Sequence, residues 1–130
     1  MTSYFHGGVP GLQIGDRLLP PDTSGTTRTV SEHAAQLCAG EHATRRDLVY
    51  VTTERQVARA YAAFYPDGAL YRVIPCGPVV ADPDHRVPGI SWHCPLAIVQ
   101  QVIDPAVLFR GRTLDRWLRM LNTIPIGAAA

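Results

Sequence analysis

Short runs of apolar residues, several of them rich in β-branched and aromatic side chains, recur along the chain and predict strands. Residues 48–52 read LVYVT, a composition typical of a strand. Near the amino end, Tyr4 and Phe5 begin another such run. Further strands are predicted at 69–75, 79–81 and 96–103. The chain therefore carries several short strands spread over most of its length.

Apolar residues also recur with helical spacing in three segments. A capping-box pattern begins a helix predicted at 29–39. A second capping-box pattern, Thr53 with Gln56, is followed by apolar residues at helical spacing, so a helix is predicted to begin directly after the preceding strand. A Pro-Asp-Gly turn at 66–68 ends this helix. The third segment, at 114–121, predicts a helix with one apolar face.

These elements define an α+β protein. Regular strand-helix-strand alternation is missing, so we expect small, mostly antiparallel β-sheets with a few short helices, and not a doubly wound nucleotide-binding fold. Loops rich in proline, glycine and polar residues are predicted at 20–28 and 82–91. At 130 residues the chain is expected to form a single compact domain, 1–130, with a frayed tail at 126–130.

Composition narrows the function classes only slightly. The chain has 46% hydrophobic and 18% charged residues, and its net charge of +1 argues mildly against nucleic acid as a partner. No apolar run is long enough to cross a bilayer and no signal peptide is visible, so no membrane partner is expected. Cys38, Cys76 and Cys94 are odd in number and form no CxxC motif, which favours a reducing, cytoplasmic location.

No metal site is expected. His85, His93, Cys76 and Cys94 could ligate zinc, but their spacing matches no standard pattern. His93 and Cys94 are adjacent, and neighbours on a strand point to opposite faces, so they make a poor nucleophile–base pair.

The stretch SYFHGG, residues 3–8, has a histidine and two glycines at the end of the first predicted strand. A lone histidine there is most simply a half-buried residue bonded to a main-chain carbonyl. The glycines favour another interpretation, because glycine lets a ligand approach the main chain and leaves N–H and C=O groups free to bind it. His6 and Gly7 suit a ligand that carries a ribose hydroxyl and a carboxamide.

Tyr50 and Tyr61 form a second candidate pair. Tyr50 lies in the strand at 48–52, and Tyr61 lies in the helix that follows. Strand-turn-helix geometry can bring the two rings face to face, and the slot between them suits a flat, cationic heterocycle. The alternative, for each residue alone, is a tyrosine of the hydrophobic core.

Three segments, in order along the chain, resemble the small rifampin ADP-ribosyltransferases, which are ADP-ribosyltransferases of the His-Tyr type. They are SYFHGGVPGLQIGDRLLPP at 3–21, DLVYVT at 47–52 and GALYRVIPCGPVVADPD at 68–84. The spacing of Tyr50 and Tyr61 is also similar to that of the stacking pair in the diphtheria-toxin-like group. The resemblance implies an ADP-ribosyltransferase-like fold, NAD as a substrate and no metal.

The resemblance also implies roles for individual residues. His6 matches the family's NAD-binding histidine, and Tyr50 matches its nicotinamide-stacking tyrosine. Asp82 matches the aspartate used where other transferases have a catalytic glutamate. His6, Tyr50 and Asp82 are thus the implied catalytic residues. The implied NAD-binding residues are His6, Gly7, Tyr50, Thr52 and Tyr61.

The acceptor of the ADP-ribose is left open. Gly8 replaces the usual Thr or Ser after His-Gly, and the carboxyl-terminal segment does not resemble that of the rifampin enzymes. A small molecule such as a rifamycin antibiotic is the first expectation, with a role in bacterial antibiotic resistance. The alternatives are a toxin or conflict-system enzyme that acts on a protein, a nucleic acid or water, and a non-catalytic module that binds NAD or ADP-ribose.

Overall fold

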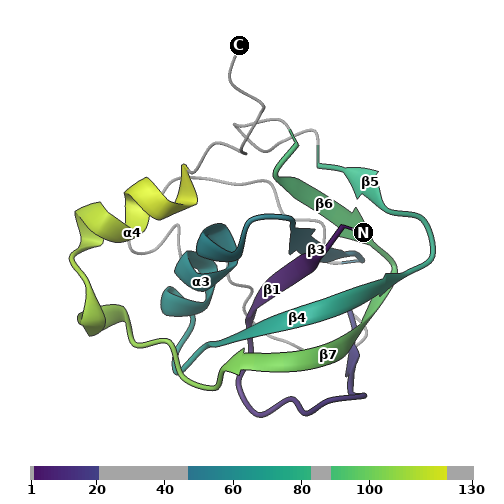
Figure 1. Ribbon diagram of the computed structural model, residues 1–130, viewed down its shortest axis with the longest axis horizontal. Coiled ribbons are helices and arrows are strands. Elements are labelled where there is room, and N and C mark those ends of the chain that lie inside the picture. The colour runs from purple at the N-terminus through teal and green to yellow at the C-terminus, as the bar shows by residue number, and fades with distance from the viewer. Residues whose placement is uncertain (1, 21–46, 83–88, 123–130) are drawn as a thin grey trace.

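The computed structural model describes residues 2–20, 47–82 and 89–122, and in these ranges the strands form one seven-stranded sheet (Figure 1). The strands are β1 (Tyr4–Gly8), β2 (Arg17–Leu18), β3 (Val49–Thr52), β4 (Ala69–Cys76), β5 (Val80–Ala81), β6 (Ser91–Cys94) and β7 (Leu96–Asp104). Their order is β2-β7-β4-β1-β3-β6-β5, and each pairing is antiparallel. The first strand of the chain is therefore at the centre of the sheet.

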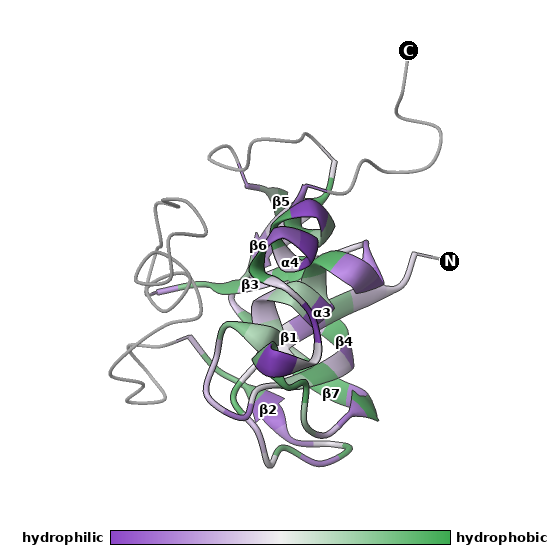
Figure 2. Cartoon of the chain, turned by 90° about the vertical axis from the view of Figure 1, so that its left-hand side faces the viewer, coloured by the Kyte–Doolittle hydropathy of each residue, from purple (hydrophilic) through white to green (hydrophobic). Residues whose placement is uncertain are grey.

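Two helices pack together against this sheet. α3 (Arg55–Ala63) follows β3 and packs on β1, and α4 (Leu114–Leu121) packs on α3 after a short 3-10 turn, η1 (Phe109–Gly111). In Figure 1 α4 lies to the left of α3, at the side of the molecule away from β5 and β6. Figure 2 shows hydrophilic residues on the outward turns of α4 and hydrophobic residues along β7. Amphipathic spacing thus directs one face of each helix inward.

Apolar side chains cover both faces of the sheet. One cluster lies between the sheet and the helices, and includes Phe5, Phe64, Leu70, Val107 and Trp117. A second cluster lies on the opposite face, and includes Leu18, Val49, Val51, Tyr71 and Val99. Residues that alternate along each central strand therefore enter different cores.

β1 and α3 approach each other unusually closely. A Cβ atom on Gly7 would overlap the carbonyl oxygen of Ala58 and would lie 2.7 Å from the main-chain nitrogen of Ala62. Only glycine at position 7 leaves room for the helix main chain. Ala58 and Ala62 have small side chains, so the helix main chain can come close to the strand. This close contact sets the distance between α3 and β1.

Most predicted elements are confirmed. β3, β4, β5 and β7 match the predicted strands at 48–52, 69–75, 79–81 and 96–103, and α4 matches the helix predicted at 114–121. The Pro-Asp-Gly turn follows α3, with Asp67 at a positive φ of 52°. Local apolar patterning was sufficient for these elements.

The predicted capping box at Thr53 and Gln56 is wrong. The N-cap of α3 is Glu54, and no side chain caps this end of the helix. The hydroxyl of Thr52 instead accepts the N–H of Glu54 at 3.1 Å, and the hydroxyl of Thr53 donates to the carbonyl of Gly89 at 3.3 Å. The Thr53 hydroxyl bonds to a residue 36 positions away in the sequence, and a motif of four neighbouring residues cannot predict such a bond.

The α+β class is confirmed and the described residues form a single compact domain, but they contain one large sheet where small sheets were predicted. β2 was missed because it has two residues, and β6 was missed because it begins at Ser91, inside the segment interpreted as a loop. The predicted helix at 29–39 and the tail at 126–130 lie outside the described residues. Within the described ranges, no helix is both long and apolar enough to cross a membrane.

Candidate active site

β1 and β3 separate at the centre of the sheet. β1 pairs with β4 from Tyr4 to Gly8, but it pairs with β3 at the single position Phe5–Thr52. Beyond that pair, the imidazole Nδ1 of His6 lies 2.7 Å from the main-chain oxygen of Tyr50. A side chain therefore joins the two strands where the antiparallel ladder ends.

This hydrogen bond defines which nitrogen of His6 carries the proton. A carbonyl oxygen only accepts, so Nδ1–H donates to Tyr50, and Nε2 of the neutral ring keeps its lone pair. Burial lowers the pKa of His6 from its ordinary value, and the bond to the Tyr50 carbonyl partly opposes that shift. His6 therefore presents a neutral ring with Nε2 as a hydrogen-bond acceptor.

Both glycines after His6 have structural reasons to be glycine. A Cβ on Gly8 would lie 2.6 Å from Nε2 of His6, so the missing side chain makes room for the ring. The side-chain position of Gly7 is occupied by the main chain of α3. Ligand approach is therefore not needed to explain these glycines, and NAD binding by Gly7 stays a prediction.

Strand register gathers polar side chains on the face that α3 covers. Residues directly opposite each other on antiparallel strands share a face, and Phe5, in the core cluster under α3, is opposite Thr52. Thr52 is opposite Ser91, and Tyr50 is opposite His93. Tyr50, Thr52, Ser91 and His93 consequently lie on one face of β3 and β6.

Tyr50 and His93 are in aromatic contact on that face. Their ring centroids are 6.0 Å apart and their planes are inclined by 79°, an edge-to-face arrangement. Both side chains are half-buried. The contact restricts the orientation of the Tyr50 ring while leaving part of it exposed.

Asp82 reaches the same face from the end of β5. Its main-chain N–H donates to the carbonyl oxygen of Ser91 at 2.9 Å, and the Ser91 hydroxyl donates to its Oδ2 at 3.2 Å. Ser91 is buried and Asp82 is half-buried. Asp82 is therefore bonded to Ser91 through both its main chain and its carboxylate, which limits the motion of the side chain.

Tyr61 enters this region from α3. Burial raises the pKa of its hydroxyl above the ordinary range, and the negative charge of Asp82 raises it further. Tyr61 also packs against the core cluster under the helices. The Tyr61 hydroxyl therefore lies within the electrostatic influence of the Asp82 carboxylate.

The fold brings together most of the residues that the sequence singled out. Tyr50, Thr52 and Asp82 lie on the α3 face of the sheet, and Tyr61 joins them from the helix. His6 is different, because it is opposite Tyr71 and belongs to the other face of β1, from which its ring reaches β3. The hydroxyl of Thr52 already accepts a main-chain N–H.

Sequence reasoning missed Ser91 and assigned no role to His93. Ser91 holds Asp82, and His93 contacts Tyr50. The alternation of both residues along one strand was the available signal, but β6 itself was not predicted. Within the described ranges, no group of three or more potential metal ligands is found, and His85, weighed above as a zinc ligand, lies outside them.

On the α3 face the structure places the half-buried ring of Tyr50 near a carboxylate that Ser91 contacts, and the imidazole of His6 approaches β3 from the other face. No protein-family model matches the chain, and no curated protein matches it significantly.

Proposed function

We propose that this chain is an NAD-dependent mono-ADP-ribosyltransferase with an ADP-ribosyltransferase-like fold. It cleaves the bond between nicotinamide and ribose and transfers ADP-ribose to an acceptor. The observation that carries the proposal is the hydrogen bond from His6 to the main chain of Tyr50, at the place where β1 and β3 separate. It links the two residues that the resemblance assigns to NAD.

The proposed roles of His6 and Tyr50 follow from the protonation of the His6 ring and from the orientation of the Tyr50 ring. The Nε2 lone pair of His6 accepts a hydrogen bond from a ribose hydroxyl, because Nδ1–H is already used by the Tyr50 carbonyl. The Tyr50 ring, whose tilt His93 restricts, stacks on the nicotinamide ring. Tyr61 contributes a second aromatic ring from α3.

Asp82 acts on the transition state. As the carbon–nitrogen bond breaks, its electron pair leaves with nicotinamide and positive charge develops at the anomeric carbon. A carboxylate held in advance by Ser91 stabilises that charge without having to reorganise. An acceptor oxygen then bonds to the anomeric carbon, and its proton passes to Asp82 or to solvent.

The first-choice acceptor is a small molecule such as a rifamycin, on the resemblance of the segments at 3–21, 47–52 and 68–84. Protein, nucleic acid and water are the alternatives, and binding without turnover is a further one. The alternatives differ in the product formed from NAD or form no product, so the fate of labelled NAD separates them.

The test is incubation with NAD labelled in its ADP-ribose part, with and without a rifamycin, followed by mass spectrometry. Nicotinamide release with a rifamycin adduct is the expected result. Release without an adduct identifies water as the acceptor, and NAD binding without release identifies a binding module. Absence of NAD binding by calorimetry contradicts the whole proposal.

A further inference from the structure

Two arginines from different elements share one phenyl ring. The guanidinium carbon of Arg55, at the start of α3, lies 5.3 Å from the ring centroid of Phe5, and that of Arg72, in β4, lies 5.6 Å from it. Phe5 and Arg72 are directly opposite each other in the sheet. The two positive charges are therefore no farther apart than the sum of these distances.

No carboxylate compensates this pair in the described part of the chain. Arginines of α3 and α4 have such partners, since Arg59 of α3 pairs with Asp104 at 2.9 Å and Arg119 of α4 pairs with Asp115 at 3.0 Å. Arg55 and Arg72 have no such ion pair there, and Nε of Arg72 is buried without a hydrogen-bond partner.

Cation–π contact explains only part of this arrangement. A ring face attracts a guanidinium, but it does not accept the in-plane N–H groups of that guanidinium. At Trp117, by contrast, the described residues place one arginine over the ring, Arg112 at 5.0 Å. Two like charges at one ring repel each other, and an oxyanion between them would remove the repulsion and satisfy the free donors.

We propose that Arg55, Arg72 and Phe5 form a binding site for a phosphate or diphosphate group, either free or carried by a nucleotide. Arginine binds phosphate through two parallel N–H donors, and the planar fork suits a tetrahedral oxyanion better than a lysine would. Phe5 contacts both guanidinium groups and so restricts where the two forks lie. Phe5 of β1 is directly opposite Thr52 of β3, so this site is next to the strand that carries Thr52 and Tyr50.

Two sources could supply the phosphate: free inorganic phosphate or diphosphate, and the phosphates of a nucleotide. Both offer the same chemistry to the arginines. The assignment to the nucleotide NAD rests on the proposed function, whereas the phosphate site itself does not. Affinities for pyrophosphate, ADP and NAD distinguish these sources.

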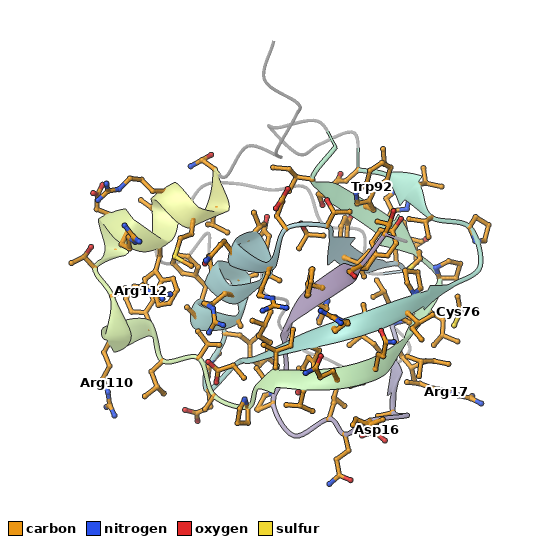
Figure 3. All side chains as sticks on the ribbon, viewed as in Figure 1. Asp16, Arg17, Cys76, Trp92, Arg110 and Arg112 are labelled. Carbon is orange, nitrogen blue, oxygen red and sulfur yellow. The ribbon has the colours of Figure 1, made fainter. Side chains whose placement is uncertain are left out.

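The experiment is calorimetry at low salt with pyrophosphate and ADP as probes, on the wild type and on the variants Arg55→Gln and Arg72→Lys. Arg55 is exposed, so its replacement tests the site even if a change at half-buried Arg72 impairs folding. Arg72→Lys keeps the charge but loses the fork. Arg110→Gln is the matched control, because Arg110 is exposed and its side chain extends from the far end of the molecule (Figure 3).

Each variant of the pair is expected to weaken probe binding about tenfold or more, while Arg110→Gln leaves it unchanged. Binding of pyrophosphate alone identifies the free ion as the ligand, and tighter binding of ADP identifies a nucleotide. The proposal is overturned if neither probe binds the wild type, or if Arg110→Gln weakens binding as much as the other variants do. Phosphate binding without NAD cleavage would refute the proposed function alone, and NAD cleavage with unchanged ADP affinity in the variants would refute this inference alone.

Discussion

His6 Nδ1 donates a hydrogen bond to the carbonyl oxygen of Tyr50 across 2.7 Å, in the gap between two central strands. In a continuous antiparallel ladder the main chain of β1 would bond to β3 at this level. Here the His6 side chain makes the bond to β3, and the main chains of β1 and β3 are paired only at Phe5 and Thr52. The bond both joins the sheet and defines the state of the imidazole, and both consequences are testable.

The stability of the protein should fall in mildly acidic solution because of His6. Its pKa is below the ordinary 6.5 in the folded chain, so the unfolded chain binds more protons at a pH between the two values. The free energy of unfolding is therefore highest above about pH 6.5 and decreases as the pH falls from there toward the lowered pKa. Denaturant unfolding of the wild type and of His6→Asn, at about pH 5 and about pH 7.5, measures this decrease. An equal pH dependence in both proteins would contradict it.

Replacing Gly7 with alanine should destabilise the fold strongly. The new methyl group would overlap the carbonyl oxygen of Ala58, so α3 must move away from β1. We expect a loss of about 3 kcal/mol in the free energy of unfolding. Gly111→Ala is the control, because a Cβ there meets nothing within 4 Å. Similar melting temperatures for the two variants would show that β1 and α3 can separate without cost.

Removing the Tyr50 ring should weaken NAD binding. Loss of a stacked aromatic surface costs about 1–3 kcal/mol, or roughly 10- to 100-fold in the dissociation constant. Tyr50→Phe keeps the ring and its edge contact with His93, so it should bind NAD almost as the wild type does. Calorimetry with NAD on Tyr50→Ala and Tyr50→Phe measures both effects. Equal affinity in the two variants would remove Tyr50 from the nicotinamide site.

Neutralising Asp82 should slow turnover and spare NAD binding. Positive charge at the anomeric carbon is much larger in the transition state than in bound NAD, so a carboxylate acts mainly on the rate. In Asp82→Asn the Ser91 hydroxyl still has an oxygen to donate to, so the local structure is retained. We expect nicotinamide release to slow about 10²- to 10³-fold with a nearly unchanged dissociation constant for NAD.

The matched control for Asp82→Asn is Asp115→Asn. Asp115 is an exposed carboxylate that pairs with Arg119 on α4, away from the site. Its replacement should leave nicotinamide release unchanged. If Asp82→Asn also releases nicotinamide at the wild-type rate, another carboxylate carries the reaction or Asp82 only shapes the turn before Pro83.

Locally patterned elements could be predicted from the sequence, and elements that depend on distant partners could not. β3 is a run of β-branched and aromatic residues, and α4 has apolar residues at a spacing of three to four, so both signals lie within the segment itself. β6 contains Trp92 and His93 between Ser91 and Cys94, with no such contrast, and it becomes a strand because β3 pairs with it. The same long-range pairing brings Ser91 to Asp82.

By itself, the sequence determined the α+β class and the main strands, and it singled out His6, Tyr50 and Tyr61 as candidates, to which the resemblance added Asp82. Only the tertiary structure decided that Gly7 makes room for α3, that His6 donates to a carbonyl of β3, and that two arginines share one phenyl ring. The physical reason is how far apart in the sequence the interacting residues lie. Patterning and turn formation act among residues a few positions apart, whereas register, close packing and charge compensation depend on residues that meet only after the sheet has formed.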